Sequence, residues 1–273
     1  GALLRGDKPY GDRYNFTLSD LIGASSAAPL ITLSRHKVVN ILFPEFRHWP
    51  VDRDAIEQAG DRVRRKADEF QHGDGADMDN VALTPLLVRK TENIIVFVNT
   101  EDAFEEPAAG YGNVTEEDLT DDIISFFRPT GVLIHNVVFE DESGLAAICA
   151  GFAEKQAAGE PLVYCQSYDV IANERHGIAP YRPSICWVYL NRAQAWIDQL
   201  NVSGGDLVND LHAGEGSFKN FPHYLTFAEQ GVALIDLDRE RVVALSNFGA
   251  WMVMESAAYI AENLGSANLP VPQ

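Results

Sequence analysis

The sequence predicts an α/β protein with a mostly parallel central sheet. Short apolar runs rich in β-branched residues alternate with segments of helical periodicity, which is the pattern of repeated strand–helix units. The run Ile94–Asn99 is continuously apolar up to its last residue, which indicates a strand covered on both faces. No internal repeat or clean linker interrupts the chain, so we expect one domain over residues 1–273.

Apolar residues three or four positions apart indicate helices along the whole chain. Thr17 or Ser19 can cap the first of these helices, and Pro29 is expected to kink it or end it early. The expected helices are Leu18–Ser34, Asp54–Phe70, Val81–Lys90, Ser143–Ala158, Arg192–Leu200 and Leu237–Leu264.

Strands are expected where apolar and β-branched residues are concentrated between turn signals. The glycine-rich, polar segment Asn201–Lys219 is expected to be a loop. The expected strands are Ile94–Asn99, Val132–Phe139, Leu162–Ile171 and Pro183–Leu190.

Charge and composition limit the partners that the chain can have. The formal net charge is −19 at pH 7, and such a surface repels nucleic acid and anionic membranes, so we expect no nucleic-acid partner. No stretch approaches about 18 uninterrupted apolar residues, so the sequence predicts no transmembrane segment.

The three cysteines, Cys149, Cys165 and Cys186, each lie in an apolar run, and no CxxC spacing occurs. The sequence therefore predicts three buried free thiols and no disulfide framework. Free thiols favour a reducing compartment such as the cytoplasm.

The most informative stretch is Gly73–Thr100, GDGADMDNVALTPLLVRKTENIIVFVNT, which we call the aspartate motif. Gly73 and Gly75 flank Asp74 and permit backbone torsions that other residues avoid. An aspartate between two glycines is little crowded, so its carboxylate can project into a cleft. A short helix and a buried strand are expected to follow it.

This stretch resembles the aspartate motif of the patatin and cytosolic phospholipase A2 superfamily. There, Asp-Gly-Gly or Asp-Gly-Ala is followed by an asparagine, an apolar helix ending near an arginine, and a strand of the form IIVF. The matching positions here are Asp74, Gly75, Ala76, Asn80, Pro85, Leu86, Leu87, Arg89 and Ile94–Asn99. The segments Gly177–Leu190 and Asn220–Phe227 also look like bacterial patatin-like proteins.

The resemblance implies a patatin-like three-layer fold, with helices flanking the sheet, and a serine–aspartate dyad without histidine. In such a dyad a serine attacks an ester carbonyl and the aspartate is its general base. Asp74 would be that base, Gly73 and Gly75 would shape its turn, and Asn80 would steady it. The implied activity is that of a hydrolase in lipid degradation, a phospholipase, lysophospholipase or esterase that acts on a lipid or ester substrate.

The nucleophile of this dyad is not evident in the sequence. Gly-x-Ser-x-Gly, which carries the serine in the family, does not occur. The nearest segment, Gly23–Ala27 with Ser25, lacks the second glycine and follows a predicted helix start rather than a strand. The chain begins at Gly1 inside a loop-like segment, so we expect an upstream segment or an N-terminal partner to carry the serine and the oxyanion loop.

Two alternatives remain open. The chain could be a catalytically inactive patatin-like module that binds lipid or protein. Asp74, Asp77 and Asp79 could form a calcium loop, but their spacing does not fit an EF-hand, and no histidine pair has zinc-ligand spacing. We therefore expect neither a metal nor another cofactor.

Overall fold

The computed structural model describes residues 45–48, 68–71, 79–100, 102–130, 133, 135–200, 206–223, 226–227, 233–234 and 237–265. The chain divides into two compact units, residues 1–80 and residues 81–273, which are described separately. The prediction of one domain over residues 1–273 stays a prediction. None of the helices in these described ranges is long and apolar enough to cross a membrane.

The first unit contains a pair of short strands. Strands β1 (Glu45–His48) and β2 (Asp68–Gln71) pair antiparallel, with Phe46 opposite Phe70. The predicted helix Asp54–Phe70 is therefore wrong over its last three residues, where pairing with β1 competes with the helical pattern. The rest of that helix, and the helix predicted for Leu18–Ser34, lie outside the described residues.

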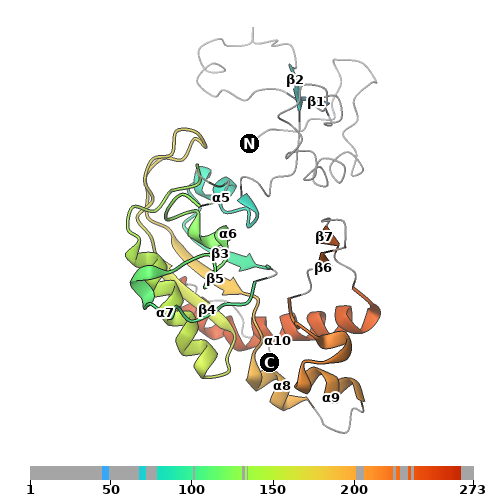
Figure 1. The fold of residues 1–273 in the computed structure, drawn as a ribbon. Coiled ribbons are helices and arrows are strands. Elements are labelled where there is room, and N and C mark those ends of the chain that lie inside the picture. The colour runs from blue at the N-terminus through green and yellow to red at the C-terminus, as the bar shows by residue number, and fades with distance from the viewer. Residues whose placement is uncertain are drawn as a thin grey trace, which may run out of the picture. The chain divides into compact units, whose positions relative to one another are not determined.

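The second unit alternates helices and strands and contains a three-stranded sheet (Figure 1). Several of its elements are short, and two 3₁₀ helices, η3 and η5, occur among them. In chain order the elements are α5 (Thr84–Val88), β3 (Asn93–Val98), η3 (Tyr111–Asn113), α6 (Asp121–Ile124), α7 (Ser143–Ala157), β4 (Leu162–Ser167), β5 (Ser184–Tyr189), α8 (Gln194–Gln199), α9 (Asp206–Ala213), η5 (Gly216–Phe218), β6 (Thr226–Phe227), β7 (Ala233–Leu234) and α10 (Arg239–Asn263).

The sheet has the order β3–β5–β4 and is mixed. Strand β3 runs parallel to β5, and β4 runs antiparallel to it. The α/β class is confirmed, whereas the expected parallel arrangement holds for one of the two strand pairs. Parallel strands need a long crossover connection, usually a helix. The chain between β4 and β5 instead returns along itself, as the bond from the amide of Val170 to the carbonyl of Tyr181 shows.

Strand β5 is covered on both faces, and each face belongs to a different core. Ile185, Trp187 and Tyr189 are buried in the core that contains α7 and the α5–α6 region. Cys186 and Val188 are buried in the core formed with α8, α9 and α10. Figure 1 shows α7 and α10 on either side of the sheet. The prediction of an apolar strand within Pro183–Leu190 is confirmed.

Strand β3 is covered on one face only. Ile94, Val96 and Val98 are buried, but Ile95 is 41% and Phe97 is 60% exposed. The prediction of a strand covered on both faces is therefore wrong. Ile95 and Phe97 lie beside Cys186 and Val188 in the parallel register, so they belong to the α10 face of the sheet. Helix α10 packs against β4 and β5, which leaves the part of that face on β3 open.

Two further predictions are corrected. The strand expected at Val132–Phe139 is wrong in its described part, where only Phe139 forms an isolated bridge, with Val170. There the amides of Val138 and Phe139 both donate to the carbonyl of Phe126, so this segment is tied to the residues that follow α6 and forms no strand ladder. The loop expected at Asn201–Lys219 contains α9 and η5, because Leu211 and Phe218 anchor these short helices in the core of α8 and α10. The helices α7 and α10 are confirmed.

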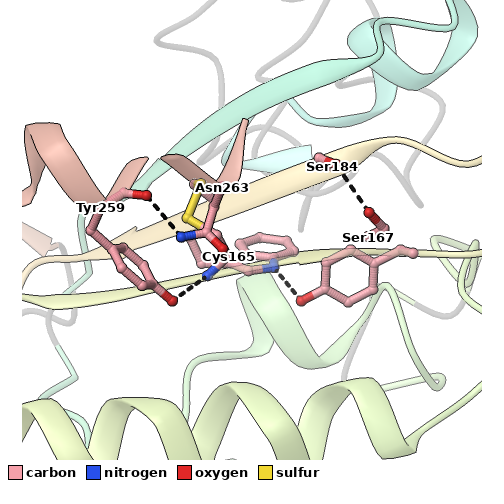
Figure 2. Close-up of a disulfide and its surroundings, with 8 residues drawn as sticks. Cys165, Ser167, Ser184, Tyr259 and Asn263 are labelled. Atoms are coloured by element: carbon pink, nitrogen blue, oxygen red, sulfur yellow. Dashed lines mark hydrogen bonds between the residues drawn. A yellow bond between two sulfur atoms is a disulfide. The ribbon is translucent and has the colours of Figure 1, made fainter. Parts of the chain in front are cut away.

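Two of the three cysteines form a disulfide, so the prediction of three free thiols is wrong. Cys165 on β4 lies opposite Cys186 on β5, and the two sulfur atoms are bonded (Figure 2). The observation that favoured a reducing compartment therefore no longer holds. Cys149 is free, as predicted, and burial raises the pKa of its thiol to about 12, so it stays protonated.

Helix α7 approaches the sheet closely at a glycine. A Cβ atom added to Gly151 would lie 2.2 Å from Cδ2 and 3.0 Å from Cγ of Tyr164 on β4. Because the contact reaches the root of the ring, a small rotation of the tyrosine does not relieve it. Gly249 on α10 has no atom within 4 Å of its would-be Cβ, so it offers a matched comparison.

Reduction of the disulfide should lower the free energy of unfolding by roughly 3 kcal/mol, because the bond closes a loop of 21 residues in the unfolded chain. Urea unfolding with and without a phosphine reductant measures the loss, and Cys149→Ala should show the same loss. Alkylation of the unreduced, unfolded protein should label Cys149 alone. Labelling of all three cysteines would contradict the disulfide.

Gly151→Ala should destabilise the protein by about 1–3 kcal/mol, because overpacking against Tyr164 outweighs the gain in helix propensity. Gly249→Ala should instead stabilise it, by up to about 1 kcal/mol, because the added methyl group meets open space. Urea unfolding of both variants measures the difference. Equal effects of the two substitutions would show that α7 is not held close to β4.

Candidate functional site

The residues predicted to act in catalysis fall mostly outside the described part of the chain. Asp74, Gly73 and Gly75 lie there, and so does Ser25. Asn80 is described, and it is an exposed residue in the turn that precedes Val81. Its role in steadying the Asp74 turn stays a prediction.

The second half of the aspartate motif forms a helix, a turn and a strand in the predicted order. Pro85 lies in the first turn of α5, where its missing N–H costs no helical hydrogen bond. Leu87 is fully buried, and Arg89 Nη1 donates to the carbonyl of Pro85 at 2.6 Å. The hydroxyl of Tyr181 donates to the carbonyl of Thr91 at 3.1 Å and so fixes the turn into β3. Residues 85–91 of the motif are thus anchored against the core of the second unit.

A buried polar cluster lies at the carboxyl ends of the parallel strands β3 and β5. Thr100 follows β3, Asn191 follows β5, and both are buried. His223 reaches both, since Nδ1 lies 2.8 Å from the carbonyl oxygen of Thr100 and Nε2 lies 3.2 Å from Oδ1 of Asn191. In open α/β sheets ligands bind outside this edge of the strands. The cluster therefore marks the edge at which a site is expected.

The cluster holds the loops that leave this edge. The amide of Phe104 donates to Oδ1 of Asn191 at 3.3 Å, and the hydroxyl of Tyr189 donates to the carbonyl of Asp102 at 2.8 Å. Because both ring nitrogens of His223 already face oxygen atoms, the ring can accept a proton from a substrate only by breaking one of these contacts. The geometry is that of a histidine that positions two loops.

A serine–aspartate pair, Ser143 and Asp141, is hydrogen-bonded within the described ranges. Ser143 donates to Asp141 from both its hydroxyl and its backbone amide, at the start of α7. These bonds lower the pKa of the Asp141 carboxyl, which makes it a weaker base. A general base needs a pKa near the working pH. The pair therefore fixes the turn that leads into α7, and its carboxyl is poorly suited to act as a general base.

Two carboxylates share the hydroxyl group of one threonine. Thr130 is buried, and its hydroxyl contacts Glu116 and also Asp121, the latter at 3.0 Å. Burial raises the pKa of the Asp121 carboxyl, and the nearby charges of Glu116 and Asp102 add to this effect. In the ranges that the structure describes, no three histidine, cysteine, aspartate or glutamate side chains are placed to hold a metal ion.

The sequence patterns did not indicate the roles of His223, Asn191 and Thr100. Thr100 lies 123 residues from His223 in the chain, and Asn191 lies 32 residues from it, so no local pattern connects them. One feature of the sequence could have located the cluster. A polar residue shortly after each of two apolar strands indicates the carboxyl edge of the sheet, where Thr100 and Asn191 lie.

No protein-family model matches the chain, and neither a curated protein nor a solved structure does.

His223→Phe should destabilise the protein by roughly 2 kcal/mol, because it keeps the ring volume but removes the ring nitrogens that face the carbonyl oxygen of Thr100 and Oδ1 of Asn191 in a buried site. Urea unfolding measures this loss, and hydrogen exchange at the amide of Phe104 should become faster. His135→Phe is the control, because the side chain of His135 is exposed, and it should change stability by less than about 0.5 kcal/mol. If both variants are equally stable, the cluster does not hold the loops.

Proposed function

We propose that the chain is part of a lipolytic acyl hydrolase of the patatin-like type and supplies Asp74 as the general base of a serine–aspartate dyad. The aspartate motif carries the proposal, because Asp74, Asn80, the apolar helix and the strand follow one another in the family's order. The observed helix α5 and strand β3 support that reading of its second half.

In the proposed reaction Asp74 takes the proton from a serine hydroxyl as the serine oxygen attacks the ester carbonyl. The tetrahedral intermediate collapses, the alcohol leaves with the proton from Asp74, and an acyl-serine remains. Water then attacks the acyl-serine, again with Asp74 as base, and releases the carboxylic acid. Backbone N–H donors of a glycine-rich loop would stabilise the oxyanion.

We propose that an upstream segment or an N-terminal partner supplies the serine and this loop, because the sequence lacks Gly-x-Ser-x-Gly. Such a segment would add strands and complete a three-layer fold. The exposed Ile95 and Phe97 support this, since they offer apolar surface that a further element can bury. The interface would be of the obligate kind, on the order of 2,000 Å² or more.

Asp74→Asn should lower esterase activity of the complete assembly at least about a hundredfold, because the amide keeps the size of the side chain but cannot act as a base. Hydrolysis of a short-chain ester measures the loss, and the unfolding midpoint should stay unchanged. Asp77→Asn makes the same chemical change three residues away and should leave the rate unchanged.

Two results would contradict the proposal. A fully active Asp74→Asn assembly would exclude the aspartate as base. Turnover by residues 1–273 alone that is abolished by Ser25→Ala would place the nucleophile inside this chain. An assembly that never hydrolyses esters would favour the alternative, a module that binds lipid or protein without catalysis.

A further inference from the structure

An apolar groove of about 590 Å³ lies between α8, α9, η5 and the first turns of α10. Three buried residues that line it, Trp196, Leu211 and Phe218, are called its inner wall, and Val243 lines it as a half-exposed residue. The volume falls within the range of roughly 300–1,000 Å³ that is usual for small-molecule sites. The groove is built from the last third of the chain and uses no residue of the aspartate motif.

The inner wall is rigid. The ring of Trp196 stacks on Phe221 with centroids 5.4 Å apart and contacts Phe248 at 4.9 Å. Trp196, Leu211 and Phe218 are each at most 5% exposed, so the packing around them fixes their positions. Val243, which also lines the groove, is 50% exposed. An apolar wall that faces an open groove favours a ligand with an apolar body.

Among the described residues that line the groove, two are charged, and their exposure places them at its mouth. Arg239 and Glu240 occupy the first turn of α10, and both are exposed. The next arginine, Arg241, pairs with Asp238, with Nε 3.8 Å from Oδ2. Arg239 has no ion-pair partner among the residues that the structure describes. An unpaired guanidinium therefore stands at the entrance of an apolar groove, in a chain whose net charge is −19.

We propose that this groove binds a single-chain amphiphile with an anionic head group. The chain lies along Trp196, Phe218 and Val243, and the carboxylate or phosphate of the head lies at Arg239. The guanidinium suits either head group because it presents several N–H donors in one plane. None of the residues that line the groove belongs to the proposed dyad.

Glu240 points to an alternative ligand, one with a cationic head group, which the test must exclude. Its carboxylate at the same mouth attracts a cationic head group, for which Arg239 would be repulsive. Alkyl chains of equal length that end in a carboxylate, a phosphate, a hydroxyl or an ammonium group separate these cases, because they bury the same apolar surface.

The experiment is a titration of the full chain with decanoate, decyl phosphate, decanol and decylamine below their micelle concentrations, followed by calorimetry and by tryptophan fluorescence. We expect saturable binding in which both anions bind more tightly than decanol, and decylamine most weakly. Affinity should rise about fourfold for each methylene added between octanoate and decanoate. The ratio of decyl phosphate to decanoate identifies the preferred head group. Trp196→Phe should remove the fluorescence response.

Arg239→Gln should weaken binding of decanoate about three- to tenfold and leave decanol unchanged, because it removes only the charged contact at the head. Arg241→Gln makes the same change of net charge two residues away, outside the groove, and should leave both affinities unchanged. Ala244→Phe, which fills the groove, should weaken all four ligands.

Absence of saturable binding, tighter binding of decylamine than of decanoate, or equal losses in Arg239→Gln and Arg241→Gln would each overturn the proposal. Because Arg239 is exposed and Arg241 is only partly buried, neither substitution disturbs the core, and their result decides even if Ala244→Phe does not fold. These binding results do not depend on the hydrolase proposal. Absence of ligand binding to the groove would likewise leave the test of Asp74 unaffected.

Discussion

The pairing of β5 with strands on both its edges is the constraint on which the second unit depends. Its buried residues alternate between two cores, so each helical layer is positioned against the same strand. Trp187 shows how complete this burial is, because the ring is fully buried and its Nε1 donates to the hydroxyl of Tyr168 at 2.9 Å. A buried indole N–H without such a partner would cost free energy. The strand thus satisfies its polar group within one of the two cores that it joins.

The parallel alignment of β3 with β5 also places the polar cluster. Because the two strands run in the same direction, the residues that follow them, Thr100 and Asn191, emerge at one edge. His223 then bridges two loops that are distant in the chain. If β3 were antiparallel to β5, these loops would leave at opposite ends of the sheet and one imidazole ring could not reach both.

Sequence patterns predicted those features that local residues determine. The strands β3 and β5 and the helices α7 and α10 come from apolar runs and helical spacing, which a single segment contains. The direction of β4 and the disulfide depend instead on pairing between segments. Cys165 and Cys186 lie in separate apolar runs, and only the register of β4 against β5 shows that they face each other. The same holds for Phe97, whose exposure depends on where α10 packs and not on its neighbours in sequence.

The two edges of the sheet differ in a way that decides where further strands can add. At the β4 edge the hydroxyl of Tyr259, from α10, accepts from the amide of Cys165 at 3.4 Å, and Asn263 Nδ2 in turn donates to the carbonyl of Tyr259 (Figure 2). At the β3 edge the carbonyls of Glu92 and Val98 accept from β5, so the alternate residues Asn93, Ile95 and Phe97 direct their backbone groups away from it. No strand in the described ranges pairs with them. An uncharged edge strand of this kind is an aggregation hazard unless another element covers it. A further strand beside β3 would pair the free backbone groups of Asn93, Ile95 and Phe97. It would also cover part of the exposed Phe97 side chain, which α10 does not reach.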